Sequence, residues 1–183
     1  MRRFVHTAAA AMVALAFFTI SCAAQGIPTN RPGQFWGTYL HQMQVGPGMS
    51  MPVLITFHID GTVTGASAVM FSGLPGAPAR YSPVFGIWRR TDSNSIATTG
   101  MFMAFDAATG VLTGFARSRA RLDFSDGFNS YTGSEYLEVT PCASPLACNP
   151  LDPNAVWTPL AGMPPTGFTS TGTRLELLMP PSS

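Results

Sequence analysis

Few side chains of this chain could carry out chemistry. Beyond residue 24 it has two histidines, His41 and His58, and both lie in stretches typical of strands. Neither has a third metal ligand at a suitable spacing, so we interpret both as structural or surface residues and expect no metal site. The chain also lacks a Gly-x-Ser-x-Gly motif and a glycine-rich phosphate loop carrying lysine. The sequence therefore assigns no catalytic residue and no cofactor.

Local structure explains most of the carboxylates. Five aspartates fall in predicted turns, where the side chain accepts hydrogen bonds from nearby backbone. They are Asp60, Asp92, Asp106, Asp126 and Asp152. We interpret Asp123, Glu138 and Glu176 as solvated charges on strands. Glu135 remains, because the strand pairing given below turns it inward, where it either contacts a ligand or indicates a register wrong by one residue. A carboxyl group among apolar neighbours resists ionisation and could act as an acid.

Eight strand-like runs, separated by turn signals such as Asp60-Gly61, must position these residues. The runs are residues 34–42, 51–59, 62–72, 83–90, 96–105, 111–124, 131–140 and 173–179. Sequential hairpins imply a meander, and eight meandering strands have exposed edges unless the sheet closes. We therefore predict an all-β fold, an eight-stranded antiparallel up-and-down barrel, ahead of an open two-sheet sandwich.

The register of the central hairpins predicts which side chains face the interior. In residues 111–124 the interior side carries small and apolar residues, and the other side carries three arginines. Pairing residue numbers that sum to 255 sets Arg117 opposite Glu138 in the next strand. Pairing over the preceding turn sets Met101 against Ala116 inside the barrel, with bulky residues facing small ones. The predicted ligand-binding residues are Met101, Met103, Phe105, Tyr131 and Glu135.

The first 24 residues predict export. Arg2 and Arg3 precede an apolar run over residues 8–20 and then small residues, which together indicate a signal peptide. Cleavage after Ala24 would leave one β-barrel domain, residues 25–183, in a secreted or periplasmic protein. Alternatively, residues 19–22 loosely resemble a bacterial lipobox, and Cys22 would then be the lipid anchor of a membrane-attached lipoprotein. No later apolar run is long enough to span a membrane.

Two other features limit structure and partners. Cys142 and Cys148 lie six positions apart, and in an oxidising compartment they are expected to form a disulfide that pins a proline-rich loop, residues 141–172. Charged residues make up 10% of the chain and the formal net charge is +1, so no basic patch for nucleic acid is expected.

Several strings spread from residue 34 to residue 178 resemble a group of small exported bacterial proteins. They include FWGTYL, ITFHIDGTV, SPVFGIWRRTD, MFMAFDAATGVLTGFARSRARL, YTGSEYLEV and GTRLEL. These proteins have a lipocalin-like, calycin-type barrel. The resemblance implies that Trp36 on the first strand packs beneath Arg174 on the last, plugging one barrel end with a cation against a ring face. The other end would then be the mouth.

Three functions remain open, since a fold by itself does not deliver an activity. The first is non-catalytic binding of a small apolar molecule, because the small residues of strand 111–124 could leave room inside. The second is a structural envelope protein with a filled barrel. The third is a barrel enzyme, a cyclase or isomerase of the allene-oxide-cyclase or dirigent kind, with Glu135 as its candidate acid. We rank them in that order.

Overall fold

The computed structural model of the protein describes residues 35–68, 70 and 79–176. The predicted signal peptide, Cys22 and the end of the strand predicted over residues 173–179 lie outside these residues. Within the described part of the chain, no helix is long and apolar enough to cross a membrane.

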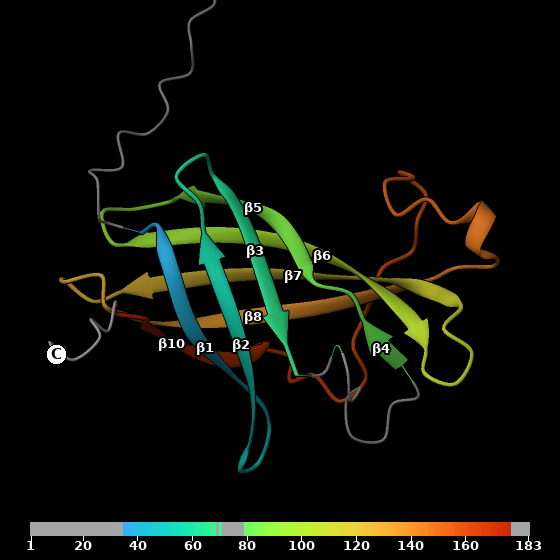
Figure 1. The fold of residues 1–183 in the computed structure, drawn as a ribbon, viewed down its shortest axis with the longest axis horizontal. Coiled ribbons are helices and arrows are strands. Elements are labelled where there is room, and N and C mark those ends of the chain that lie inside the picture. Colours follow the sequence, from blue (N-terminus) through green and yellow to red (C-terminus); the bar gives the residue numbers. More distant parts are fainter. Residues whose placement is uncertain (1–34, 69, 71–78, 177–183) are drawn as a thin grey trace, which may run out of the picture.

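Eight strands form a closed antiparallel barrel, which confirms the predicted fold. Each strand pairs with the one before it in the chain order, and the last strand pairs with both the first strand and its own predecessor (Figure 1). The barrel strands are β1 (Gly37–Gly46), β2 (Met49–Phe57), β3 (Thr62–Ser67), β5 (Val84–Arg90), β6 (Ser95–Asp106), β7 (Leu112–Phe124), β8 (Ser130–Pro141) and β10 (Phe168–Arg174).

Among the described residues, three short elements lie beside the barrel. The short strand β4 (Ala79–Tyr81) pairs with β6, and β9 (Thr158–Pro159) pairs with β8. A single 3-10 turn, η1 (Pro145–Ala147), follows β8. The long strands β6, β7 and β8 extend past the barrel toward the end where β4 and η1 lie (Figure 1).

The register between β7 and β8 is the predicted one. Arg117 pairs with Glu138 and Arg119 with Tyr136, and these pairs sum to 255. The interior face of β7 is also confirmed from Gly114 to Phe124, where the inward residues are mostly buried and two of the three arginines on the other face are exposed.

The register between β6 and β7 was predicted wrongly by one residue over most of its length. Phe105 pairs with Leu112 as expected, but Ala104 then pairs with Gly114, so Thr113 is an extra β7 residue. This bulge shifts every later pair, because an extra residue in one strand changes its phase against the other. Met101 consequently pairs with Arg117 on the outer face.

The final strand also lies elsewhere than predicted. It spans Phe168–Arg174 and ends where the prediction of residues 173–179 begins. Its inward positions are Phe168, Ser170 and Gly172, and two small residues weaken the apolar alternation that marks a strand. The proline-rich segment before it is shorter than predicted, and the Cys142–Cys148 disulfide expected there is present.

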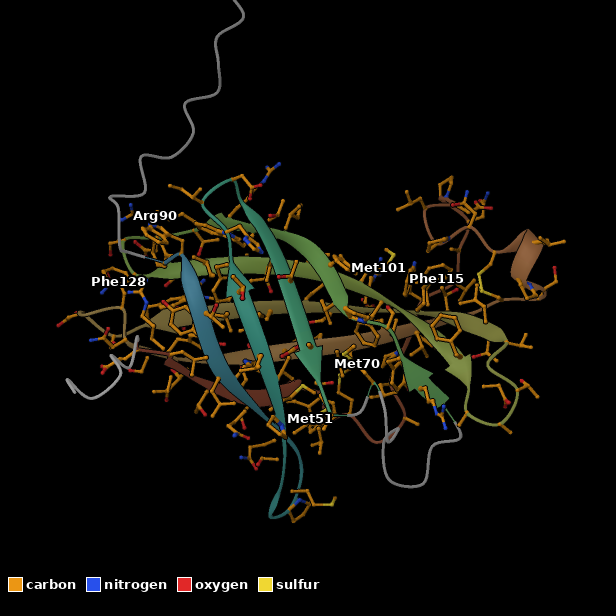
Figure 2. All side chains as sticks on the ribbon, in the orientation of Figure 1. Met51, Met70, Arg90, Met101, Phe115 and Phe128 are labelled. Carbon is orange, nitrogen blue, oxygen red and sulfur yellow. A yellow bond between two sulfur atoms is a disulfide. The ribbon has the colours of Figure 1, made fainter. Side chains whose placement is uncertain are left out.

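The core has two parts. An aromatic cluster fills one end of the barrel, and a smaller cluster of Met43, Leu137 and Phe168 lies toward the other. The buried members of the aromatic cluster are Phe35, Tyr39, Phe57, Val63, Trp88, Ile96, Leu122, Phe124 and Tyr131. Figure 2 shows Arg90 and Phe128, which lie at the aromatic end, well away from Met51, which packs against the second cluster.

Arg174 lies at the aromatic end, with contacts that differ from those implied by the lipocalin resemblance. Its guanidinium donates a hydrogen bond to the backbone carbonyl of Trp36, and the ring beneath the cation is that of Tyr39, with 5.7 Å from Cζ to the ring centroid. The Trp36 side chain is half-buried, and its Nε1 has no hydrogen-bond partner among the described residues. Arg174 thus ties the start of β1 to the end of β10.

Arg174→Ala is expected to lower the free energy of unfolding by about 1–3 kcal/mol, through lost packing on Tyr39 and lost hydrogen bonding. Urea denaturation measures the loss. Arg121→Ala is the matched control, because that side chain is 61% exposed and makes a long 3.5 Å ion pair with Asp123. The control should change stability by no more than about 0.5 kcal/mol. Equal midpoints for the two variants would contradict the role of Arg174.

Candidate functional site

A cavity of about 80 Å³ lies inside the barrel, next to the smaller core cluster. Most of its wall is apolar, with side chains such as Val53, Ile55 and Phe102. The polar side chains that reach it are His41, Ser67, Tyr81, Ser82, Thr98, Ser118 and Glu135. The interior of an eight-stranded barrel is only just wide enough to be filled by side chains, so small residues on its wall leave space. Gly65, Gly100 and Ala120 provide that space here.

Glu135 is the charged group of this cavity. It lies on β8 between Gly133 and Leu137 and faces inward, as the register predicted. One carboxylate oxygen accepts a hydrogen bond from Ser118 Oγ at 2.5 Å, and the other lies 3.2 Å from His41 Nε2. The side chains of His41 and Glu135 are 6% and 13% exposed, so the pair is largely removed from solvent.

His41 extends this network to Tyr131. Its Nδ1 lies 2.9 Å from the Tyr131 hydroxyl, so four side chains form one chain of hydrogen bonds: Ser118, Glu135, His41 and Tyr131. The Tyr131 ring occupies the space over Gly172, where a Cβ atom would come within 2.1 Å of the ring. Glycine at that position therefore lets the Tyr131 ring lie over β10 at the point where the two residues pair.

The network sets the protonation of its members. Burial alone would raise the pKa of Glu135, but hydrogen bonds from His41 and Ser118, with the charge of His41, hold that pKa below its ordinary value. Burial raises the pKa of the Tyr131 hydroxyl far above its ordinary value, and the neighbouring Glu135 charge raises it further. At neutral pH Glu135 is a carboxylate and Tyr131 is neutral. Glu135 therefore lacks the raised pKa that a carboxyl group surrounded only by apolar neighbours would have, because His41 and Ser118 stabilise its charge.

The structure places the five predicted ligand-binding residues differently. Glu135 lines the cavity, whereas Tyr131 is buried behind it in the aromatic cluster. Met101 and Met103 lie on the outer side of β6 because of the bulge, and Phe102 takes the inward position. Phe105, next to the bulge, is half-buried and is not part of the cavity wall.

Sequence reasoning missed His41, which is 4% exposed inside the barrel. It was interpreted as a structural or surface residue, and it is the main partner of Glu135. A signal was present, because His41 alternates in phase with Tyr39 and Met43, which are also buried on β1. Its closeness to Glu135, 94 residues later, has no counterpart in the local pattern.

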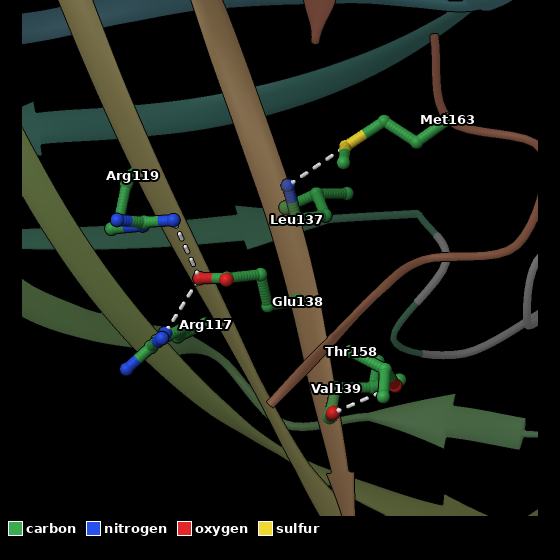
Figure 3. Close-up of polar contacts among 7 residues, drawn as sticks. All are labelled: Arg117, Arg119, Leu137, Glu138, Val139, Thr158 and Met163. Carbon is green, nitrogen blue, oxygen red and sulfur yellow. Dashed lines mark hydrogen bonds and ion pairs between the residues drawn. The ribbon is translucent and has the colours of Figure 1, made fainter. Parts of the chain in front are cut away.

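On the outer face of β7, the three arginines Arg117, Arg119 and Arg121 form ion pairs within the protein. Arg117 Nε and Arg119 Nη2 lie 2.7 and 3.0 Å from the same oxygen of Glu138 (Figure 3). The Arg117 guanidinium also lies 4.4 Å from the ring centroid of Trp157. Hydrogen bonding from Arg117, with the charge of Arg119, lowers the pKa of Glu138. These contacts explain Arg117 and Arg119 as structural residues.

Two further contacts hold the segment that follows β8 against that strand (Figure 3). The Leu137 amide donates to the sulfur of Met163 at 3.2 Å, and the Thr158 hydroxyl donates to the Val139 carbonyl at 3.3 Å. Leu160 and Met163 pack on the core cluster that contains Leu137. The segment therefore covers part of the cavity end of the barrel.

Comparisons with known proteins add no assignment, since no family model, no curated protein and no solved structure matches the chain. Among residues 35–68, 70 and 79–176, no group of three or more histidine, cysteine, aspartate or glutamate side chains could hold a metal ion. The cavity and its polar network are therefore the basis for a functional assignment.

Proposed function

We propose that this protein binds a small apolar molecule inside its barrel without catalysing a reaction. The observation that carries this proposal is the cavity of about 80 Å³ with mostly apolar walls, beside an end of the barrel that aromatic side chains fill. Apolar cavities of about 150 Å³ bind benzene, so this one would hold a few heavy atoms or the inner end of a longer molecule. Met43, Met51 and Phe102 would contact that molecule.

The proposal extends to the cellular setting. A lipocalin-like, exported bacterial protein agrees with the leader sequence, with the closed eight-stranded barrel and with the Cys142–Cys148 disulfide, since such bonds persist in oxidising compartments. Cys22 is either lost with the leader or retained as a lipid anchor. Binding inside the barrel is compatible with both forms.

The two alternative functions, a structural protein with a filled barrel and a barrel enzyme, have less support. A structural protein with a filled barrel would not need a cavity that a charged network borders. A cyclase or isomerase that used Glu135 as its acid would need that carboxyl group protonated, whereas its pKa lies below the ordinary value and both ring nitrogens of His41 have partners within the network. The same groups suit a site that recognises a polar end of its ligand.

Xenon binding tests the proposal, because xenon occupies apolar cavities without requiring a polar partner. Under xenon pressure, backbone amide signals of residues around the cavity should shift saturably in NMR spectra. Ala120→Leu should abolish the shifts, because Ala120 lines the cavity and the added atoms occupy its volume. Ala97→Leu is the matched control, since Ala97 is exposed on the outer side of β6, and should leave the shifts unchanged. Wild-type protein without a saturable shift would refute interior binding.

A further inference from the structure

The hydrogen-bond donors of the buried network are used inside it. The Ser118 hydroxyl donates to one oxygen of Glu135, and His41 Nε2 donates to the other. At His41 Nδ1 the partner is the Tyr131 hydroxyl. A carboxylate offers about four acceptor sites, so two sites of Glu135 remain after these bonds, and the Ser118 oxygen keeps acceptor capacity as well. Where Glu135 and Ser118 line the cavity, its wall therefore offers hydrogen-bond acceptors.

The rest of the wall does not compensate the carboxylate with a positive charge. None of the described residues that line the cavity is arginine, and the chain contains no lysine. The Thr98 hydroxyl is separated from Glu135 by Ala120, which pairs with both residues across the sheet. The Ser82 hydroxyl already donates to the Pro83 carbonyl at 2.8 Å. A ligand anion would thus lie beside the Glu135 carboxylate, and His41, the histidine of the cavity wall, already uses both ring nitrogens inside the network.

We infer that the cavity selects molecules whose buried end donates hydrogen bonds to Glu135, with small aliphatic primary amines as the preferred class. The inference rests on the proposed function and names the ligand chemistry. A protonated amine brings three donors and a charge opposite to that of the carboxylate, and charge-assisted hydrogen bonds are about twice as strong as neutral ones. An alcohol brings one donor. A carboxylic acid would have to be bound protonated or beside a like charge, and both are unfavourable at neutral pH.

Three probes of equal chain length test this selection: pentan-1-amine, pentan-1-ol and pentanoic acid. Their affinities for the purified protein are measured at pH 7 by calorimetry, with NMR shifts of amides around the cavity to locate binding. We expect the amine to bind about tenfold tighter than the acid, with the alcohol between them, since a charge-assisted bond exceeds a neutral one by roughly 1.4 kcal/mol.

Glu135→Gln should remove the preference for the amine over the acid and leave the affinity for the alcohol nearly unchanged. Glu138→Gln is the matched control, because it removes the same charge from the same strand on the outer face, where Glu138 pairs with Arg117 and Arg119. The control should keep the wild-type order of affinities. If Glu135→Gln does not fold, the order of the three affinities in the wild-type protein tests the amine preference by itself.

The outcomes separate the two proposals. Equal affinities for the three probes, or tighter binding of the acid, would overturn the amine preference while interior binding stands. A preference for the amine that persists in Glu135→Gln would equally overturn it. If xenon does not shift the amides around the cavity, interior binding is refuted, and the inferred selectivity falls with it.

Discussion

Replacing His41 with leucine is expected to lower the free energy of unfolding by about 3–5 kcal/mol, because removal of one partner leaves a buried charge without compensation. In the wild-type protein His41 lies 3.2 Å from Glu135 and connects it to Tyr131. In His41→Leu the carboxylate would keep Ser118 as its remaining hydrogen-bond donor among these side chains. Urea denaturation at pH 7 measures the loss.

The dependence of this loss on pH has a predictable sign. In the wild-type protein the folded-state pKa of Glu135 lies below the unfolded value of about 4.5, so its stabilising contribution is present above that value and is lost as the pH falls through the folded-state pKa. In His41→Leu, burial should raise the pKa of the carboxyl group above the unfolded value. That variant should therefore gain stability on acidification from pH 7 to pH 5.

The double variant His41→Leu/Glu135→Leu is the control for this explanation. With the charge removed as well, most of the lost stability should return, since apolar residues can replace a buried ion pair at little cost. The double variant should also lack the gain on acidification. If it is as unstable as His41→Leu, the loss would reflect packing of the imidazole ring, and the uncompensated charge would not be its cause.

Phe35→Ala is expected to cost about 3–5 kcal/mol, the usual range for removing a buried phenylalanine side chain. Phe35 is 0% exposed, and its ring makes edge-to-face contacts with Phe124 and Phe128 at centroid distances of 5.1 and 5.0 Å. The Trp88 ring also contacts it, at a centroid distance of 6.0 Å. Thermal or urea denaturation measures the change.

Phe85→Ala is the matched control, because it makes the same substitution at a side chain that is 60% exposed. It should change stability by less than about 1 kcal/mol. Xenon binding should survive in folded Phe35→Ala protein, since Phe35 belongs to the aromatic cluster and does not line the cavity. If Phe35→Ala is as stable as Phe85→Ala, the aromatic cluster does not contribute to the stability of the fold as we expect.

Local patterns in the sequence determined the meander of strands. Seven of the eight predicted strands begin within three residues of their observed starts, because alternation and turn residues such as Asp60-Gly61 act over short distances. The register of β7 against β8 could also be predicted, since a short turn joins them and their polar faces match. That register by itself predicted that the Glu135 side chain faces the interior of the barrel. Closure of the barrel followed from the need to cover sheet edges.

Only the tertiary structure decided what surrounds Glu135. The bulge at Thr113 places Met101 on the outer face of the barrel. A bulge goes with a local change in the twist of two strands, and the alternation of apolar and polar residues in the sequence does not reveal it. Closure of the barrel through β10 sets Gly172 opposite both His41 and Tyr131, and His41 bonds to Tyr131 and to Glu135. These neighbours are distant in the chain and meet only when the sheet closes. The ionised state of Glu135, and with it the chemistry of the cavity, is therefore a property of the closed barrel.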